Sequence, residues 1–266
     1  MSGPSPAFDL FAPGSASVMV LFGARVGGVM LIAPVFSARN VPVMVRASLL
    51  VLLTVLLQPA ALARVTTIPQ VTPTTALSET LIGFAIGLGA ALLVGAAEAA
   101  GEIVSIQMGL SGAALFDPLS QTQVTALGQF TQLLAIALLL AVDAHLVMLD
   151  SLAESVRVLP VGSAVDLRGG VGAMLSLGST LFVLGLRFAA PVIAAVLVAN
   201  VALAVLGRAA PQLNILSVAF PIQIGIGLFA LVASVPLLAA LFGGWGSTYD
   251  AVLTRLFTAF TGAGGR

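Results

Sequence analysis

The sequence predicts an all-α integral membrane protein, and three observations support this prediction. Hydrophobic residues make up 59% of the 266 residues and charged residues only 8%, whereas a soluble domain carries about 25% charged residues. Six apolar blocks with roughly the length that a membrane helix needs follow one another along the chain. No stretch between or after these blocks has the composition of a separate soluble domain. Residues 1–266 are therefore expected to form a single domain.

The six blocks are separated mainly by proline-containing connections. They span residues 15–33, 47–63, 76–97, 126–149, 171–206 and 215–242. Asp117-Pro118 is a typical helix start, because Asp can cap free N–H groups and Pro is favoured at the first helical position. The block 171–206 would extend roughly 54 Å as one helix, which exceeds the roughly 30 Å hydrocarbon core. Because Pro191 and Asn200 lie inside it, we expect a kinked helix or a tight hairpin.

The two ends of the chain are short. Residues 1–14 are rich in Pro and Gly and are expected to form a flexible N-terminus. No basic residue precedes the first apolar block, so this lead-in does not resemble a secretory signal and the block is expected to stay in the mature protein. Residues 246–266 have a weakly amphipathic helical pattern.

Small residues at every fourth position predict a close helix contact, because they let two backbones approach in a membrane. The predicted stripe consists of Gly83, Gly87, Ala91, Gly95 and Ala99. A shorter stripe contains Gly23 and Gly27.

Ionisable residues inside apolar blocks are costly and usually face protein or water. Glu98 and Glu102 are four residues apart and share one helix face. Paired carboxylates could serve a glycosidase, a metal or a proton relay, but the chain has no second acidic cluster and no histidine nearby. A polar helix end, or contacts with neighbouring subunits, is the favoured interpretation. Asp143 and His145 do not face each other in a helix, so a satisfied interfacial histidine is favoured over a proton relay.

Composition excludes several kinds of site. The chain has no cysteine and one histidine, which excludes disulfides, thiolate ligands and multi-histidine metal sites. The net charge is zero, so nothing indicates a nucleic-acid partner. No nucleophile elbow, phosphate loop or metal-spaced cluster appears. We therefore expect no enzyme activity, no metal and no cofactor.

One connection is unusual. Residues 101–118 read GEIVSIQMGLSGAALFDP, with no charge from Ile103 to Phe116 and many small residues. Composition alone describes an apolar linker that ends at a helix cap.

This stretch resembles the signature of the FliR family of flagellar export-apparatus subunits, and three further stretches agree in order and spacing. These are RVGGVMLIAPVFSARNVPVMVR (25–46), AHLVMLDSL (144–152) and LGRAAPQLNILSVAFP (206–221). The resemblance implies long kinked helical hairpins in the export gate of a type III secretion system. It also implies FliP-type and FliQ-type partners around a central pore, docking of FlhB, passage of unfolded flagellar proteins, and a location in the bacterial inner membrane at the flagellar basal body.

The resemblance assigns roles to residues. A loop that plugs the closed pore would contain Gln107, Met108, Gly109, Leu110, Ser111, Gly112, Leu115, Phe116 and Asp117. Assembly with other subunits would use Arg25, Glu98, Glu102, Arg208, Pro211, Gln212 and Asn214. Many family members carry bulkier aromatic residues where this chain has Gly112-Ala113-Ala114.

Three alternatives remain open at this stage. The equivalent subunit of a virulence injectisome is related, although Gly101-Glu102 and Gln107-Met108-Gly109 favour the flagellar branch. A small-molecule secondary transporter with broken helices would predict internal symmetry, and no clear repeat is visible. A purely structural membrane scaffold is the third alternative.

Overall fold

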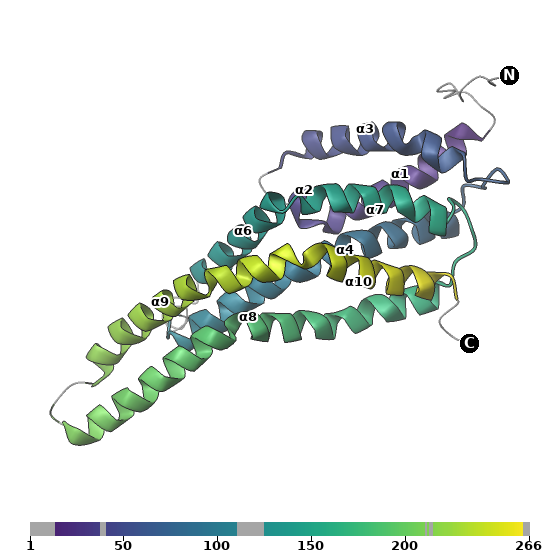
Figure 1. Ribbon diagram of the computed structural model, residues 1–266. Helices are drawn as coiled ribbons and strands as arrows, with labels where there is room; N and C mark the ends of the chain where they lie inside the picture. The colour runs from purple at the N-terminus through teal and green to yellow at the C-terminus, as the bar shows by residue number, and fades with distance from the viewer. Residues whose placement is uncertain (1–13, 38–40, 111–124, 211, 213–214, 263–266) are drawn as a thin grey trace. The chain divides into compact units, whose positions relative to one another are not determined.

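The computed structural model describes residues 14–37, 41–110, 125–210, 212 and 215–262 (Figure 1). Within these ranges every regular element is a helix, so the predicted all-α class is confirmed. The helices are α1 (Ser15–Ile32), α2 (Pro34–Ser37), α3 (Val43–Leu62), α4 (Pro73–Gln107), α6 (Ala126–Ala141), α7 (Ala144–Val158), α8 (Leu167–Ala209), α9 (Ile215–Gly243) and α10 (Trp245–Phe260).

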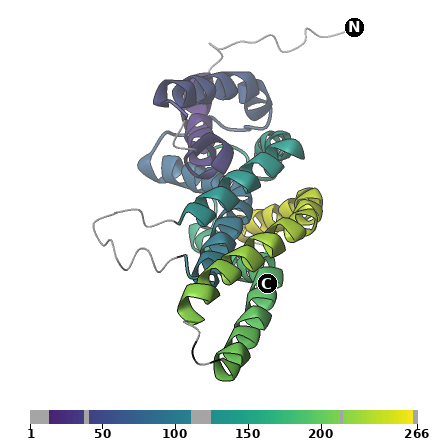
Figure 2. The ribbon, with the colours of Figure 1, turned by 90° about the vertical axis from the view of Figure 1, so that its left-hand side faces the viewer.

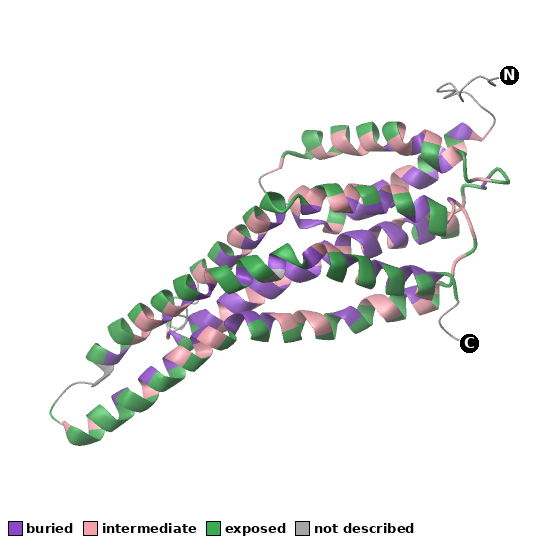
Figure 3. Cartoon of the chain, viewed as in Figure 1, coloured by how far each residue is buried: buried purple, intermediate pink, exposed green. Residues whose placement is uncertain are grey.

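Five of the described helices are long and apolar enough to cross a membrane. They are α1, α3, α4, α8 and the part of α9 from Ser217 to Ala240, and α6 with α7 would add a sixth if the pair forms one broken span. Much of the apolar surface of α3, α8 and α9 is exposed, and most of α3 is green or pink in Figure 3. Met44 of α3 is 84% exposed and Phe182 of α8 is 75% exposed. Such surface needs lipid or a partner protein to cover it, so the chain is a membrane protein.

Two expected blocks differ in the structure. The block 126–149 is broken, because α6 ends at Ala141 and α7 begins at Ala144. Asp143 between them has φ 54°, a left-handed conformation that Asp tolerates better than most residues. The block 171–206 lies inside the single helix α8, which runs through Pro191, so the hairpin alternative is wrong. A hairpin requires a turn, and one missing N–H donor in a long apolar helix does not supply one.

The chain divides into two compact units, each built from segments that are distant in sequence. The first unit comprises residues 1–91, 143–177 and 246–266, and the second comprises residues 92–142 and 178–245. The units share α4 and α8, whose first parts belong to the first unit and whose later parts belong to the second. The expected single domain stays a prediction.

In the first unit α1 packs against α3 and against the first part of α4. Phe22 and Val26 of α1 are completely buried. The expected amphipathic tail forms α10, which buries Tyr249, Leu256 and Phe260. The hydroxyl of Tyr249 donates a 3.0 Å hydrogen bond to the carbonyl of Ile86 in α4. This amphipathic C-terminal helix is thus held by a few fully buried side chains.

In the second unit α8 and α9 run beside each other, as the views in Figures 1 and 2 agree. The rings of Phe188 and Phe242 stack with centroids 6.4 Å apart. Asn200 accepts a 2.6 Å hydrogen bond from the side-chain amide of Gln223. The later part of α4 and α6 complete this unit.

Candidate functional site

The C-terminal end of α4 lies in the connection that the sequence singled out. Gly109 has φ 75°, and its N–H donates to the carbonyl of Ile106 at 3.0 Å. The N–H of Leu110 donates to the carbonyl of Ser105, also at 3.0 Å. These two bonds with a left-handed glycine form a Schellman motif, which satisfies carbonyls that the helix end leaves free. Residues 107–109 therefore terminate the helix in a defined way.

Met108 at this end is completely buried, and its side chain lies against Gly227 of α9. A Cβ built at Gly227 would lie 2.6 Å from Cγ and Sδ of Met108, and one built at Gly109 would lie 2.8 Å from the ring of Phe220. Carbon atoms in ordinary contact are about 3.5–4.0 Å apart. The end of α4 thus touches α9 at Gly109 and Gly227, where an added Cβ would make the facing side chain shift.

Thr125 is the first residue described after the connection, and it is also tied to α4. Its side-chain oxygen accepts from the N–H of Gly128 at 3.0 Å, which caps α6. Its own N–H donates to Oε1 of Glu102 at 2.7 Å. Glu98, one turn earlier, accepts a 2.7 Å hydrogen bond from the side-chain amide of Gln132. The two glutamates share one face, as predicted from their spacing, and that face binds α6 of the same chain. Their role in assembly with other subunits stays a prediction.

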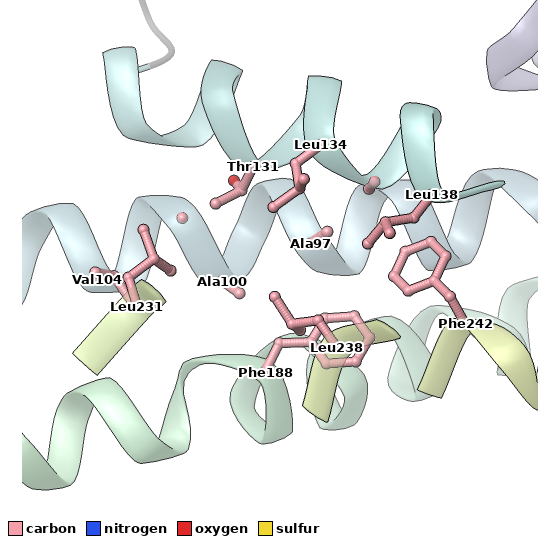
Figure 4. Close-up of a pocket in the computed structure, with 12 residues that line it drawn as sticks. Ala97, Ala100, Val104, Thr131, Leu134, Leu138, Phe188, Leu231, Leu238 and Phe242 are labelled. Atoms are coloured by element: carbon pink, nitrogen blue, oxygen red, sulfur yellow. The ribbon is translucent and has the colours of Figure 1, made fainter. Parts of the chain in front are cut away.

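A small apolar cavity lies beside this site, among α4, α6, α8 and α9 (Figure 4). Its volume is about 20 Å³, close to the space that one water molecule needs. Thr131, its hydroxyl-bearing residue, already donates within α6. The cavity offers a ligand neither room nor a free polar group. Among the residues that the structure describes, no three His, Asp or Glu side chains gather to hold a metal ion.

The predicted plug residues fall into two groups. Gln107 is exposed at the end of α4, Met108 is buried and Gly109 forms the cap. Leu110 is 38% exposed. The other predicted plug residues lie outside the described part of the chain: Ser111, Gly112, Leu115, Phe116 and Asp117. The predicted helix start at Asp117-Pro118 lies outside it as well.

The predicted assembly residues of the last connection divide in the same way. Arg208 and Gln212 are exposed, as side chains that meet another subunit must be before assembly. Pro211 and Asn214 lie outside the described residues.

Arg25 has a different environment from the one expected. Its side chain is completely buried, and Nε donates to Oε2 of Glu79 at 2.7 Å. Its two terminal nitrogens donate to the hydroxyl of Ser155 at 3.0 Å and to the carbonyl of Leu159 at 2.9 Å. Oε1 of Glu79 accepts from the N–H of Gly162 at 2.8 Å. The side chain of Arg25 is therefore not available to another subunit, because α4 and α7 enclose it and use its donors.

The small-residue stripe of α4 faces more than one helix. A Cβ at Gly83 would collide with the backbone carbonyl of Arg25 in α1, and one at Gly87 would lie 3.1 Å from the backbone of Val29. A Cβ at Gly95 instead meets Leu181 of α8 at 3.2 Å. Ala91 between them is partly exposed. Close approach of α1 to α4 accounts for the first two glycines.

His145 does not match its favoured interpretation. Its Nδ1 is buried with no hydrogen-bond partner among the described residues, so the histidine is not satisfied at that atom. Asp143 occupies the N-cap position of α7 without a side-chain capping bond.

Sequence reasoning missed Phe220, Gln223 and Gly227 of α9 as neighbours of the connection. The only local signal is their spacing, which places them on one helix face. Thr125 was also missed, although a threonine before an apolar run is a common helix cap.

Helices of membrane-spanning length, exposed apolar surface and buried polar contacts between helices define an integral membrane protein of the all-α class. The sequence matches the family "bacterial export proteins, family 1" over residues 16–246, and the chain belongs to that family.

Individual relatives agree with the family match. The chain is 37% identical to the flagellar biosynthetic protein FliR of Pectobacterium carotovorum, over 77% of this chain and 79% of the relative. It is 33% identical to FliR of Escherichia coli K12 over 81% of this chain and 83% of the relative. FliR of Bacillus subtilis 168 is 28% identical over 78% of this chain and 82% of the relative.

Proposed function

We propose that this chain is a subunit of the flagellar type III export gate. The observation that carries the proposal is the match to bacterial export proteins over residues 16–246, together with FliR relatives that align over most of their own length. The chain would form part of the pore through which unfolded flagellar proteins cross the inner membrane at the basal body. The role is structural and requires no catalytic group or cofactor.

The exposed apolar surface supports assembly with partners. Large apolar side chains are exposed on α3, α8 and α9, including Met44, Phe182 and Phe229. A single chain in water would expose an unusual amount of apolar area. FliP-type and FliQ-type subunits, FlhB and lipid are the proposed neighbours. Arg208 and Gln212, both exposed, are proposed to contact these subunits together with Pro211 and Asn214.

Residues 107–117 are proposed to belong to a loop that closes the pore before export. Two features of the described residues support this proposal. The chain leaves α4 through a hydrogen-bonded cap at Gly109, and it returns at Thr125, which is bonded to Glu102 of the same helix. Irregular backbone at membrane depth is tolerated only where it is buried in protein or lines a cavity. From Leu110 to Phe116 the chain carries no charge and includes several small residues, which suits such a position.

Isolation of the native complex tests the assignment to the export gate. A tagged version of the chain is purified from flagellated cells in mild detergent, and its companions are identified by mass. We expect FliP-type and FliQ-type subunits in fixed proportion. A particle that contains this chain alone and binds a small molecule would support the secondary transporter instead.

Deletion of residues 110–115 tests the pore loop. We expect the assembled complex to leak ions, measured as conductance in planar bilayers, because the apolar residues that exclude water are removed. The matched control is the wild-type complex with the same tag and the same companions. Unchanged conductance in a deletion complex of normal composition would contradict the loop's role and would favour a structural scaffold.

A further inference from the structure

One face of α9 receives the end of α4. Phe220, Gln223 and Gly227 are spaced three and four residues apart, so they lie on one side of the helix. Phe220 lies against Gly109, and Met108 occupies the space beside Gly227. Oε1 of Gln223 lies 3.8 Å from the position that a Cβ would take at Gly109. These three residues, which we call the α9 seat, lie beside Met108 and Gly109, the two residues that follow α4.

A side chain added at residue 227 would displace the side chain of Met108. Three side-chain atoms of Met108 lie within 2.9 Å of the point where a Cβ at residue 227 would be placed. Met108 is completely buried, and a packed interior resists such a displacement. Gly225, on the same helix and two residues away, has no atom within 4 Å of its Cβ position. Of these two glycines, only Gly227 therefore has a Cβ position that meets Met108.

The α9 seat is also bonded to α8. The side-chain amide of Gln223 donates to Oδ1 of Asn200 at 2.6 Å. Both residues lie in helices long and apolar enough to cross a membrane, where polar side chains commonly join helices by hydrogen bonds. A shift of α8 relative to α9 would therefore act on the residue that adjoins Gly109.

We propose that the α9 seat positions the point at which the chain leaves α4, with Met108 held against Gly227 as the positioning contact. The proposal rests on the proposed function, in which the residues that follow close the pore. Met108 then serves as the anchor of that segment on α9. The hydrogen bond from Gln223 to Asn200 links the α9 seat to α8.

The first experiment compares Gly227→Ala with Gly225→Ala in the purified complex. Amide hydrogen exchange is measured at Gly109 and Leu110, whose N–H groups form the cap bonds. We expect severalfold faster exchange in Gly227→Ala, because the new methyl group displaces Met108, and wild-type exchange in Gly225→Ala. Equal exchange in the two variants overturns the proposal.

A second variant tests whether the effect passes through Met108. In Met108→Ala/Gly227→Ala the colliding atoms of Met108 are absent, so we expect exchange closer to the wild type than in Gly227→Ala. No recovery in the double variant overturns the role of this contact. Conductance of the same complexes in bilayers is expected to follow the exchange rates.

Cross-linking tests the geometry without any assumption about function. The chain has no cysteine, so Met108→Cys/Gly227→Cys gives it a single pair of cysteines. Cγ of Met108 lies 2.6 Å from the Cβ position of residue 227. Cβ of Met108 is one bond from that Cγ, so the Cβ atoms of residues 108 and 227 are close enough for a disulfide. We expect oxidation to form the cross-link in the assembled complex, and Met108→Cys/Gly225→Cys is the control that should form little. Absence of the cross-link overturns the seat. If the complex with residues 110–115 deleted does not leak ions, the proposed role of the loop fails. The exchange and cross-linking results still test whether Met108 is held against Gly227.

Discussion

The buried pair of Arg25 and Glu79 gives the sharpest prediction about stability. Their side chains are 0% and 1% exposed, and the ionic contact is 2.7 Å long. Removing one partner of a buried ion pair costs about 3–5 kcal/mol, because the other charge remains buried without compensation. Glu79→Leu and Arg25→Met are each expected to destabilise the first unit by about this amount.

The double variant Arg25→Met/Glu79→Leu removes both charges together. Two backbone groups lose a partner, the carbonyl of Leu159 and the N–H of Gly162, at a cost of roughly 1–3 kcal/mol each. The expected total is thus roughly 2–6 kcal/mol, against roughly 6–10 kcal/mol for the sum of the single variants. The double variant should therefore be more stable than the sum of the two losses predicts.

Thermal unfolding of the detergent-purified protein, followed by circular dichroism, measures the effect. A loss of 1 kcal/mol lowers the Tm of a protein of this size by about 2–4 °C, so each single variant should melt about 10 °C below the wild type. Arg157→Met is the matched control, because its ion pair with Glu154 is exposed at both side chains and such pairs contribute little. Single variants within 2 °C of this control, or strict additivity in the double variant, would refute the reasoning.

Two further predictions concern the packing of α4 in the first unit. Gly83→Ala should destabilise the protein by about 1–3 kcal/mol, because the new methyl group collides with the backbone of α1. Gly172 is exposed in α8 and its Cβ position is open, so Gly172→Ala should stabilise the protein by up to about 1 kcal/mol. The two Tm shifts should have opposite signs, and shifts of the same sign would contradict the close approach. Burial raises the pKa of Tyr249, the only tyrosine in the sequence. The stability that the neutral hydroxyl contributes is therefore fully present below the ordinary tyrosine pKa of about 10 and is lost as the pH rises from there through the raised pKa. Tyr249→Phe should lose about 1 kcal/mol at neutral pH and should remove this alkaline component; a tyrosinate absorbance that develops at the ordinary pKa in the folded protein would exclude the buried hydrogen bond to Ile86.

Much of the helical architecture could be predicted because hydropathy is a local property. A run of apolar residues must be helical in a membrane, since its backbone groups find no water to bond. The end of α4 at Gln107 has a local cause, because Gly109 just after it is a typical helix-ending residue. The close contacts at Gly83 and Gly87 also follow from local spacing, although the sequence could not say that α1 is the helix they meet.

The boundaries that failed depend on contacts beyond the local sequence. Pro191 removes one donor, yet the surrounding apolar residues continue the helix. Asp143 breaks a block that hydropathy shows as continuous, because one left-handed residue changes the direction of the chain without changing its composition.

The sequence by itself determined the class of the protein, its apolar helices and, through motifs, its family. Tertiary structure decided which residues meet. Arg25 bonds residues 54, 130 and 134 positions away, and Met108 lies against Gly227. Composition and periodicity carry no information about such pairs, since a buried charge or a glycine has the same local pattern whichever helix it faces. Only the packing of the helices assigns Arg25 to the interior and the end of α4 to α9.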